Sequence, residues 1–89
     1  MDPKPTILIK VYGTASCPQC QGVKNYLHSK HVLFDYIDVH KDDAGMKEVE
    51  SLGVTTLPVI TTNGKLYTTG FNMKQLDKLI MEVMNNGNA

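Results

Sequence analysis

The chain has 89 residues, which is enough for one compact domain and too short for two, so we expect a single domain over residues 1–89. Nine basic residues balance nine acidic ones. This balance argues against a nucleic-acid-binding protein, which needs a basic surface, and against a polybasic membrane anchor. No apolar stretch approaches the roughly 20 residues that cross a bilayer, and the N-terminus lacks the apolar core of a signal peptide. We therefore expect a cytoplasmic protein, and we also expect it to be a monomer.

Strand and helix patterns alternate in the first half of the chain. A β-branched, apolar run ends at Gly13 and predicts a strand, and the spacing of Val23, Tyr26 and Leu27 beyond it is helical. Pro18 suits the first turn of that helix, where no amide donor is needed. Two strands joined by such a helix form a βαβ unit and should be parallel. The predicted elements are a strand at 6–12, a helix at 18–30 and a strand at 33–39.

The second half of the chain predicts a helix, a hairpin and a closing helix. Asn63-Gly64 lies between two β-prone runs, which is the strongest short-range signal for a hairpin. Asn72 suits the N-cap of the last helix, with Gln75 at the capping-box position. The predicted elements are a helix at 42–52, strands at 58–62 and 65–69, and a helical apolar stripe at 73–84. Residues 1–5 and 85–89 are predicted to be flexible tails, because they have little to bury.

This order of elements predicts an α/β fold with one four-stranded mixed sheet and helices on both of its faces. Of the only two cysteines, Cys17 lies between the first strand and the first helix, and Cys20 lies in the first turn of that helix. Such a C-x-x-C pair is either half of a zinc site or a disulfide that opens and closes. Zinc would need a second chain to complete its ligands, because the sequence has no second C-x-x-C pair. In a βαβ unit the pair indicates a redox site of the thioredoxin-like fold.

The position of the two cysteines predicts their roles. The start of a helix gathers free amides and the positive end of the helix dipole, which stabilise a thiolate. Cys17 lies at that start and is predicted to attack a substrate disulfide. Cys20, one turn further along the same helix face, is predicted to resolve the mixed disulfide and release reduced substrate. The expected activity is that of a dithiol–disulfide oxidoreductase that carries electrons.

Four segments, taken in order, resemble the glutaredoxin family. They are Cys17-Pro18-Gln19-Cys20, residues 35–39, Thr55-Thr56-Leu57-Pro58-Val59 and Thr69-Gly70-Phe71. The resemblance implies a cis peptide bond before Pro58, which would expose the backbone of Leu57 for strand-like pairing with the substrate. The expected substrate-binding residues are Tyr12, Pro18, Gln19, Thr56, Leu57, Pro58, Gly70, Phe71 and Asn72. Tyr12 either lines the substrate groove or belongs to the core, and Phe71 either contacts a partner or packs beside the last helix.

The resemblance implies two alternative electron sources. Glutaredoxins proper are reduced by glutathione, whereas the glutaredoxin-like redoxins that serve ribonucleotide reductase take electrons from thioredoxin reductase. Pro18 fits the first group and Gln19 fits the second. The basic residue that often precedes the first cysteine of glutaredoxins is absent, and their Gly-Gly-x-Asp motif is replaced by Thr69-Gly70-Phe71-Asn72. Both reductants stay open at this point, and the expected substrates are disulfides of proteins, including ribonucleotide reductase, or of small molecules.

A different class of function is an assembly module whose C-x-x-C pair holds a metal or an iron–sulfur cluster between two chains. Cluster-bridging members of the family usually have a single active-site cysteine followed by Gly-Phe-Ser. Here Cys17 is followed by Pro18-Gln19-Cys20, which argues against a cluster. We therefore expect no resident metal or cofactor, with glutathione as a possible reductant only.

Overall fold

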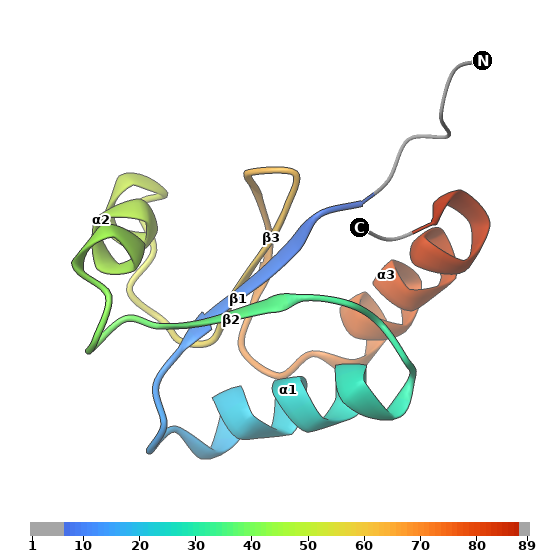
Figure 1. Ribbon diagram of the computed structural model, residues 1–89, viewed down its shortest axis with the longest axis horizontal. Helices are drawn as coiled ribbons and strands as arrows, with labels where there is room; N and C mark the ends of the chain where they lie inside the picture. The colour runs from blue at the N-terminus through green and yellow to red at the C-terminus, as the bar shows by residue number, and fades with distance from the viewer. Residues whose placement is uncertain (1–6, 88–89) are drawn as a thin grey trace.

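The computed structural model describes residues 7–87 and contains the predicted helices and strands in the predicted order (Figure 1). The elements differ from the predictions only at their ends. They are β1 (Ile9–Gly13), α1 (Pro18–Ser29), β2 (Asp35–Asp38), α2 (Asp43–Ser51), β3 (Val59–Thr62), β4 (Lys65–Thr69) and α3 (Met73–Asn86). Within the described residues, no helix combines the length and apolarity needed to cross a membrane.

The four strands form one mixed sheet in the order β2-β1-β3-β4. Strand β1 pairs with β2 in parallel, as the βαβ prediction requires, and with β3 in the antiparallel direction. Strands β3 and β4 form the predicted hairpin. In Figure 1, α1 and α3 lie on one side of the strands and α2 lies on the other. The predicted α/β architecture is therefore confirmed.

Two apolar cores cover the two faces of the sheet. Val11 and Ile60 face α1 and α3, whereas their neighbours Tyr12 and Val59 face α2, because successive side chains of a strand point to opposite faces. The first core is completed by Val23, Leu27, Leu76 and Leu79, and the second by Val39 and Val49. Since both faces are covered, every residue of β1 except Lys10 is buried. This burial fixes the carboxyl end of β1, from which the dithiol loop departs.

Local sequence signals determine the hairpin and the last helix as predicted. Asn63 and Gly64 both have positive φ angles, 51° and 82°, and they join the paired residues Thr62 and Lys65. Such a two-residue turn matches the right-handed twist of the strands it connects. Asn72 caps α3, since its side-chain oxygen accepts a hydrogen bond of 3.2 Å from the amide of Gln75.

Helix α2 is held close to the sheet by a glycine and a buried tyrosine. A Cβ atom on Gly45 would lie 2.5 Å from Cγ2 of Ile37, so only glycine allows this approach. The hydroxyl of Tyr12, whose side chain is 2% exposed, donates a hydrogen bond to the carboxylate of Glu48. These contacts compensate for the weak helix propensity of a glycine in the middle of a short helix.

The prediction of a tail from residue 85 onward needs correction at its start. Helix α3 continues through Asn85 and Asn86. Gly87 ends it with a positive φ of 85°, and its amide donates to the carbonyl of Val83 at 2.7 Å. Its carbonyl accepts a hydrogen bond of 3.3 Å from the amide of Ile7, so backbone pairing orders a segment that has no apolar side chain to bury. The other predicted tail residues, 1–5 and 88–89, lie outside the described residues.

The Tyr12–Glu48 contact predicts a loss of stability at alkaline pH. Burial, with the hydrogen bond to Glu48, raises the pKa of Tyr12 from 10.0 to about 12. The contribution of Tyr12 to the free energy of unfolding is therefore full below pH 10. It is lost as the pH rises toward 12, because Tyr12 ionises in the unfolded chain before it ionises in the folded one. We expect Tyr12→Phe to flatten the fall in unfolding free energy across this interval, measured by urea denaturation at a series of pH values. Equal slopes for the two proteins would contradict this account.

Candidate active site

The dithiol lies where the chain passes from the end of β1 into α1. Cys17 is the N-cap of α1, Pro18 occupies the first helical position, and Cys20 follows within the first turn. The two cysteines form a disulfide, with their Cα atoms 5.2 Å apart. The structure thus pairs the two cysteines that the sequence singled out.

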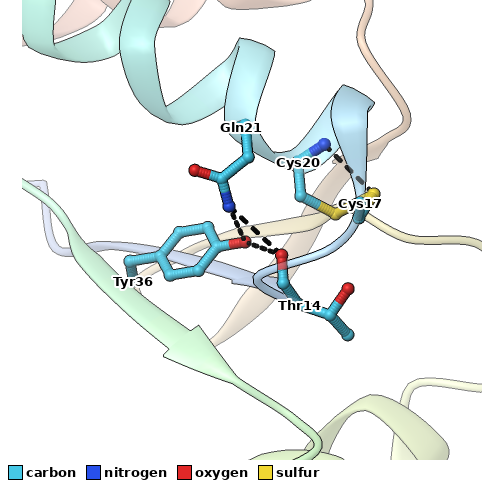
Figure 2. The surroundings of a disulfide bond; sticks show 5 residues. All are labelled: Thr14, Cys17, Cys20, Gln21 and Tyr36. Carbon is cyan, nitrogen blue, oxygen red and sulfur yellow. Dashed lines mark hydrogen bonds between the residues drawn. A yellow bond between two sulfur atoms is a disulfide. The ribbon is translucent and has the colours of Figure 1, made fainter.

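The two sulfur atoms have different surroundings. Cys17 is partly exposed, whereas Cys20 is completely buried. The amide of Cys20 donates a hydrogen bond to Sγ of Cys17 at 3.2 Å (Figure 2). The first turn of α1 carries no acidic side chain that would oppose a negative charge there. When the disulfide opens, this amide and the helix dipole favour a thiolate at Cys17, the one sulfur that a substrate can reach.

Gly13 allows the buried half of the dithiol to pack on the end of β1. A Cβ atom on Gly13 would lie 2.6 Å from the hydroxyl oxygen of Tyr36 and 2.7 Å from both Cβ and Sγ of Cys20. Real side chains do not approach this closely, so any larger residue would push α1 or β2 away. The space left by the missing side chain is shared by the sulfur of Cys20 and the hydroxyl of Tyr36.

A hydrogen-bond network that the sequence analysis missed holds the loop before Cys17. The carbonyl of Thr14 accepts from the hydroxyl of Tyr36 at 2.8 Å and from Nε2 of Gln21 at 3.2 Å (Figure 2). Nε2 of Gln21 also donates to the hydroxyl oxygen of Tyr36 at 3.3 Å. The amide of Cys17 approaches the same carbonyl at 3.5 Å. Burial, with a further contribution from Asp38, raises the pKa of Tyr36, so its hydroxyl stays protonated at neutral pH.

The segment around Pro58 supplies a second part of the candidate site. The Leu57–Pro58 peptide bond is cis, as expected. The amide of Gly70 donates to the carbonyl of Pro58 at 2.8 Å, and Oε1 of Gln19 lies 3.9 Å from the place that a Cβ on Gly70 would occupy. Within the described residues, no hydrogen bond reaches the backbone of Leu57. The structure therefore links Pro58, Gly70 and Gln19, and it leaves the amide and carbonyl of Leu57 available.

The remaining predicted substrate-binding residues differ in how accessible they are. Thr56 is exposed, and so is Asn72, although the side chain of Asn72 is engaged in capping α3. The Phe71 ring packs over Gly22 of α1, 6.3 Å from the ring of Tyr26 between centroids, and 39% of the residue is exposed. Tyr12 belongs to the core beneath α2, which is one of the two alternatives considered for it.

Histidine, cysteine, aspartate and glutamate do not cluster in a way that would hold a metal ion within residues 7–87. No group of three or more of these side chains is close enough together there. An assembly module would therefore have to complete its ligand shell from a second chain, and the metal content of the purified protein tests that alternative.

Comparison with known proteins gives consistent matches. The family model described as Glutaredoxin matches residues 9–67. A glutaredoxin-like 8.6 kDa protein from the rubredoxin operon of Clostridium pasteurianum is 39% identical over 74 residues, covering 82% of this chain and 97% of that protein. The glutaredoxin-like NrdH-redoxin of Escherichia coli superposes with a TM-score of 0.72 at 22% identity, covering 80% of this chain and 92% of its own. For a glutaredoxin of Archaeoglobus fulgidus, the TM-score is 0.68 at 28% identity, with 81% and 84% covered. The thioredoxin-like fold is thereby confirmed.

The close contact at Gly13 predicts the effect of one added methyl group. We expect Gly13→Ala to reduce the free energy of unfolding by about 1–3 kcal/mol, the usual cost of overpacking, because Cβ of Cys20 is fixed to the helix backbone. Gly22→Ala is the matched control. Its methyl group meets the ring of Phe71, which is partly exposed and can rotate, and alanine favours the helix by roughly 0.5–1 kcal/mol. Urea denaturation of the oxidised proteins compares them, and a Gly13→Ala protein as stable as Gly22→Ala would refute the steric argument.

Proposed function

Because this chain belongs to the glutaredoxin family, and is thus a thiol–disulfide oxidoreductase, we propose that it reduces protein disulfides through Cys17 and Cys20. The observation that carries the proposal is the asymmetry of the pair. A partly exposed sulfur receives an amide hydrogen bond at a helix N-terminus, and its disulfide partner is completely buried. This arrangement supports an attacking role for Cys17 and a resolving role for Cys20.

The proposed reaction has two exchange steps. The thiolate of Cys17 attacks one sulfur of the substrate disulfide, forming a mixed disulfide and releasing the other sulfur as a thiolate. Cys20 then attacks Sγ of Cys17, so that the Cys17–Cys20 disulfide forms and the second substrate sulfur departs. The free amide and carbonyl of Leu57 support binding of the substrate backbone in an extended, strand-like contact.

Thioredoxin reductase is the electron source that we propose, rather than glutathione. The segments around the dithiol, residues 13–20, 55–59 and 69–72, contain no charged side chain. Glutathione carries two carboxylates and an ammonium group. Each charge-assisted hydrogen bond that the protein does not offer to these groups lowers the binding free energy by about 1.5–3 kcal/mol. A protein partner can instead bind through backbone and apolar contacts, for which Leu57 and the exposed part of Phe71 are available.

The substrates proposed are disulfides of cytoplasmic proteins, with the disulfide of ribonucleotide reductase as the first to test. Gln19 and the Gly70-Phe71 pair, which resemble the redoxins that serve that enzyme, support this choice. The cytoplasm is proposed because a dithiol reductase works where thiols are kept reduced.

Two cysteine variants test the reaction order. We expect Cys17→Ser to abolish turnover in an NADPH-coupled assay of disulfide reduction, because no reachable thiolate remains. Cys20→Ser should instead accumulate a covalent mixed disulfide with the substrate, which intact-protein mass spectrometry detects and a small thiol reverses. Full activity of the Cys17→Ser protein would exclude the proposed mechanism.

The electron source is tested with the wild-type protein. NADPH is supplied either with thioredoxin reductase or with glutathione and glutathione reductase, and reduction of a protein disulfide is followed by NADPH absorbance. We expect the first system to sustain reduction at least tenfold faster than the second. Comparable rates, or a faster glutathione system, would overturn the choice of reductant and leave the oxidoreductase assignment in place.

A further inference from the structure

The burial of Cys20 raises a chemical problem in the resolving step. A thiol must lose its proton before it can attack a disulfide, and burial disfavours the charged thiolate. Cys20 is completely buried, so bulk water does not solvate its sulfur. A polar group of the protein has to take over that role, and it must be able to donate a hydrogen bond to a negative sulfur.

The hydroxyl of Tyr36 lies near the sulfur of Cys20, because both atoms are close to the position that a Cβ on Gly13 would take. The two atoms share the space that a Cβ on Gly13 would fill, 2.6 Å and 2.7 Å from that point. Figure 2 shows the hydroxyl between the side chain of Gln21 and the carbonyl of Thr14, with Cys20 on the helix turn beside them. In the disulfide form its proton is donated to the carbonyl of Thr14, at 2.8 Å.

The network contains a spare donor that lets the Tyr36 proton be redirected. A carbonyl oxygen has two lone pairs, and that of Thr14 faces three donors: Tyr36, Gln21 and the amide of Cys17. If the hydroxyl of Tyr36 turns away, Gln21 and the Cys17 amide still satisfy this carbonyl. Gln21 also donates to the Tyr36 oxygen, so it holds that oxygen in place while the proton swings.

We propose that Tyr36 donates a hydrogen bond to the Cys20 thiolate during the resolving step, with Gln21 as the positioning residue that frees its hydroxyl from Thr14. The inference rests on the proposed function of the dithiol. In the step itself, the thiol of Cys20 gives up its proton, which ends on the departing substrate sulfur. The new Cys17–Cys20 bond forms as the bond between Cys17 and the substrate breaks, so the two electrons of that bond leave with the reduced substrate.

The test measures the pKa of Cys20 directly. In a Cys17→Ser background Cys20 is the single thiol, and its Cβ chemical shift is followed by NMR as the pH is raised. We expect Tyr36→Phe to raise the pKa of Cys20 by about one unit, which lowers the thiolate fraction at neutral pH about tenfold. The ring of Tyr36 is retained, so the Lys24 ammonium, 5.0 Å from its centroid, and Asp38 on the same strand keep their places. The variant therefore isolates the hydroxyl.

Tyr67→Phe is the matched control. Tyr67 lies on the other edge strand, and its hydroxyl donates to a main-chain carbonyl, that of Gln75, at 3.1 Å. Burial raises its pKa as well. Removing this hydroxyl should leave the titration of Cys20 unchanged. An unchanged titration in Tyr36→Phe, or an equal shift in Tyr67→Phe, would overturn the proposal.

A double variant tests the part assigned to Gln21. Gln21→Met removes the spare donor, so the Tyr36 hydroxyl stays on Thr14 and the pKa of Cys20 rises. In the Tyr36→Phe background the same change should add nothing, because the hydroxyl is already gone. Additive shifts would contradict the coupling of the two side chains.

Turnover provides the second readout and separates this proposal from the function it rests on. With both cysteines present, we expect Tyr36→Phe to slow the decay of the mixed disulfide about tenfold at neutral pH and less at alkaline pH. A shifted pKa in a protein without any disulfide reductase activity would sink the proposed function and keep the hydrogen bond. Normal turnover with an unshifted pKa would overturn the hydrogen bond from Tyr36 and keep the proposed function.

Discussion

Helix α1 crosses the end of β1 at a position where the strand carries no side chain. At Gly13 the sulfur of Cys20 and the hydroxyl of Tyr36 occupy the space that a Cβ would fill, so helix, central strand and edge strand meet at one point. The first turn of α1 is thereby fixed against the sheet, and Cys17, one turn earlier, is carried to the surface. The geometry of the dithiol thus depends on backbone proximity and on the apolar packing of α1 beneath it, which Val23 and Leu27 provide.

The three chain segments around the dithiol present dipoles rather than formal charges. Sγ of Cys17 accepts a hydrogen bond from a main-chain amide, and the carbonyl of Thr14 accepts from the side chains of Tyr36 and Gln21. Among residues 7–87, nothing hydrogen-bonds to the backbone of Leu57. No charged side chain occurs in the three segments that form this region. The proposed partner, presenting an extended peptide, would be recognised here through shape and main-chain hydrogen bonds.

Sequence patterns predicted the elements, the sheet and the dithiol because each of these follows from local chemistry. The Asn63-Gly64 turn, the Asn72 cap and the spacing of Val23 and Leu27 act over a few residues, and the cis bond at Pro58 came from family resemblance. Tyr36 was missed because its role depends on pairing between β1 and β2, which brings it to Gly13 from 23 residues away in the chain. Asn85 and Asn86 were assigned to a tail because apolar periodicity does not register a helix end that is fixed by backbone hydrogen bonds.

A backbone hydrogen bond between Ile7 and Gly87 brings the segment before β1 next to the end of α3. The amide of one and the carbonyl of the other lie 3.3 Å apart, at the end of β1 remote from the dithiol. Joining Ile7 to Gly87 would require only a short linker, and closing so short a gap costs little chain entropy. Circular permutation is commonly tolerated when the ends of a domain lie this close. The molecule is therefore a suitable scaffold for permuted redox sensors, in which new chain ends are opened in a surface loop while the dithiol and its supporting strands stay together.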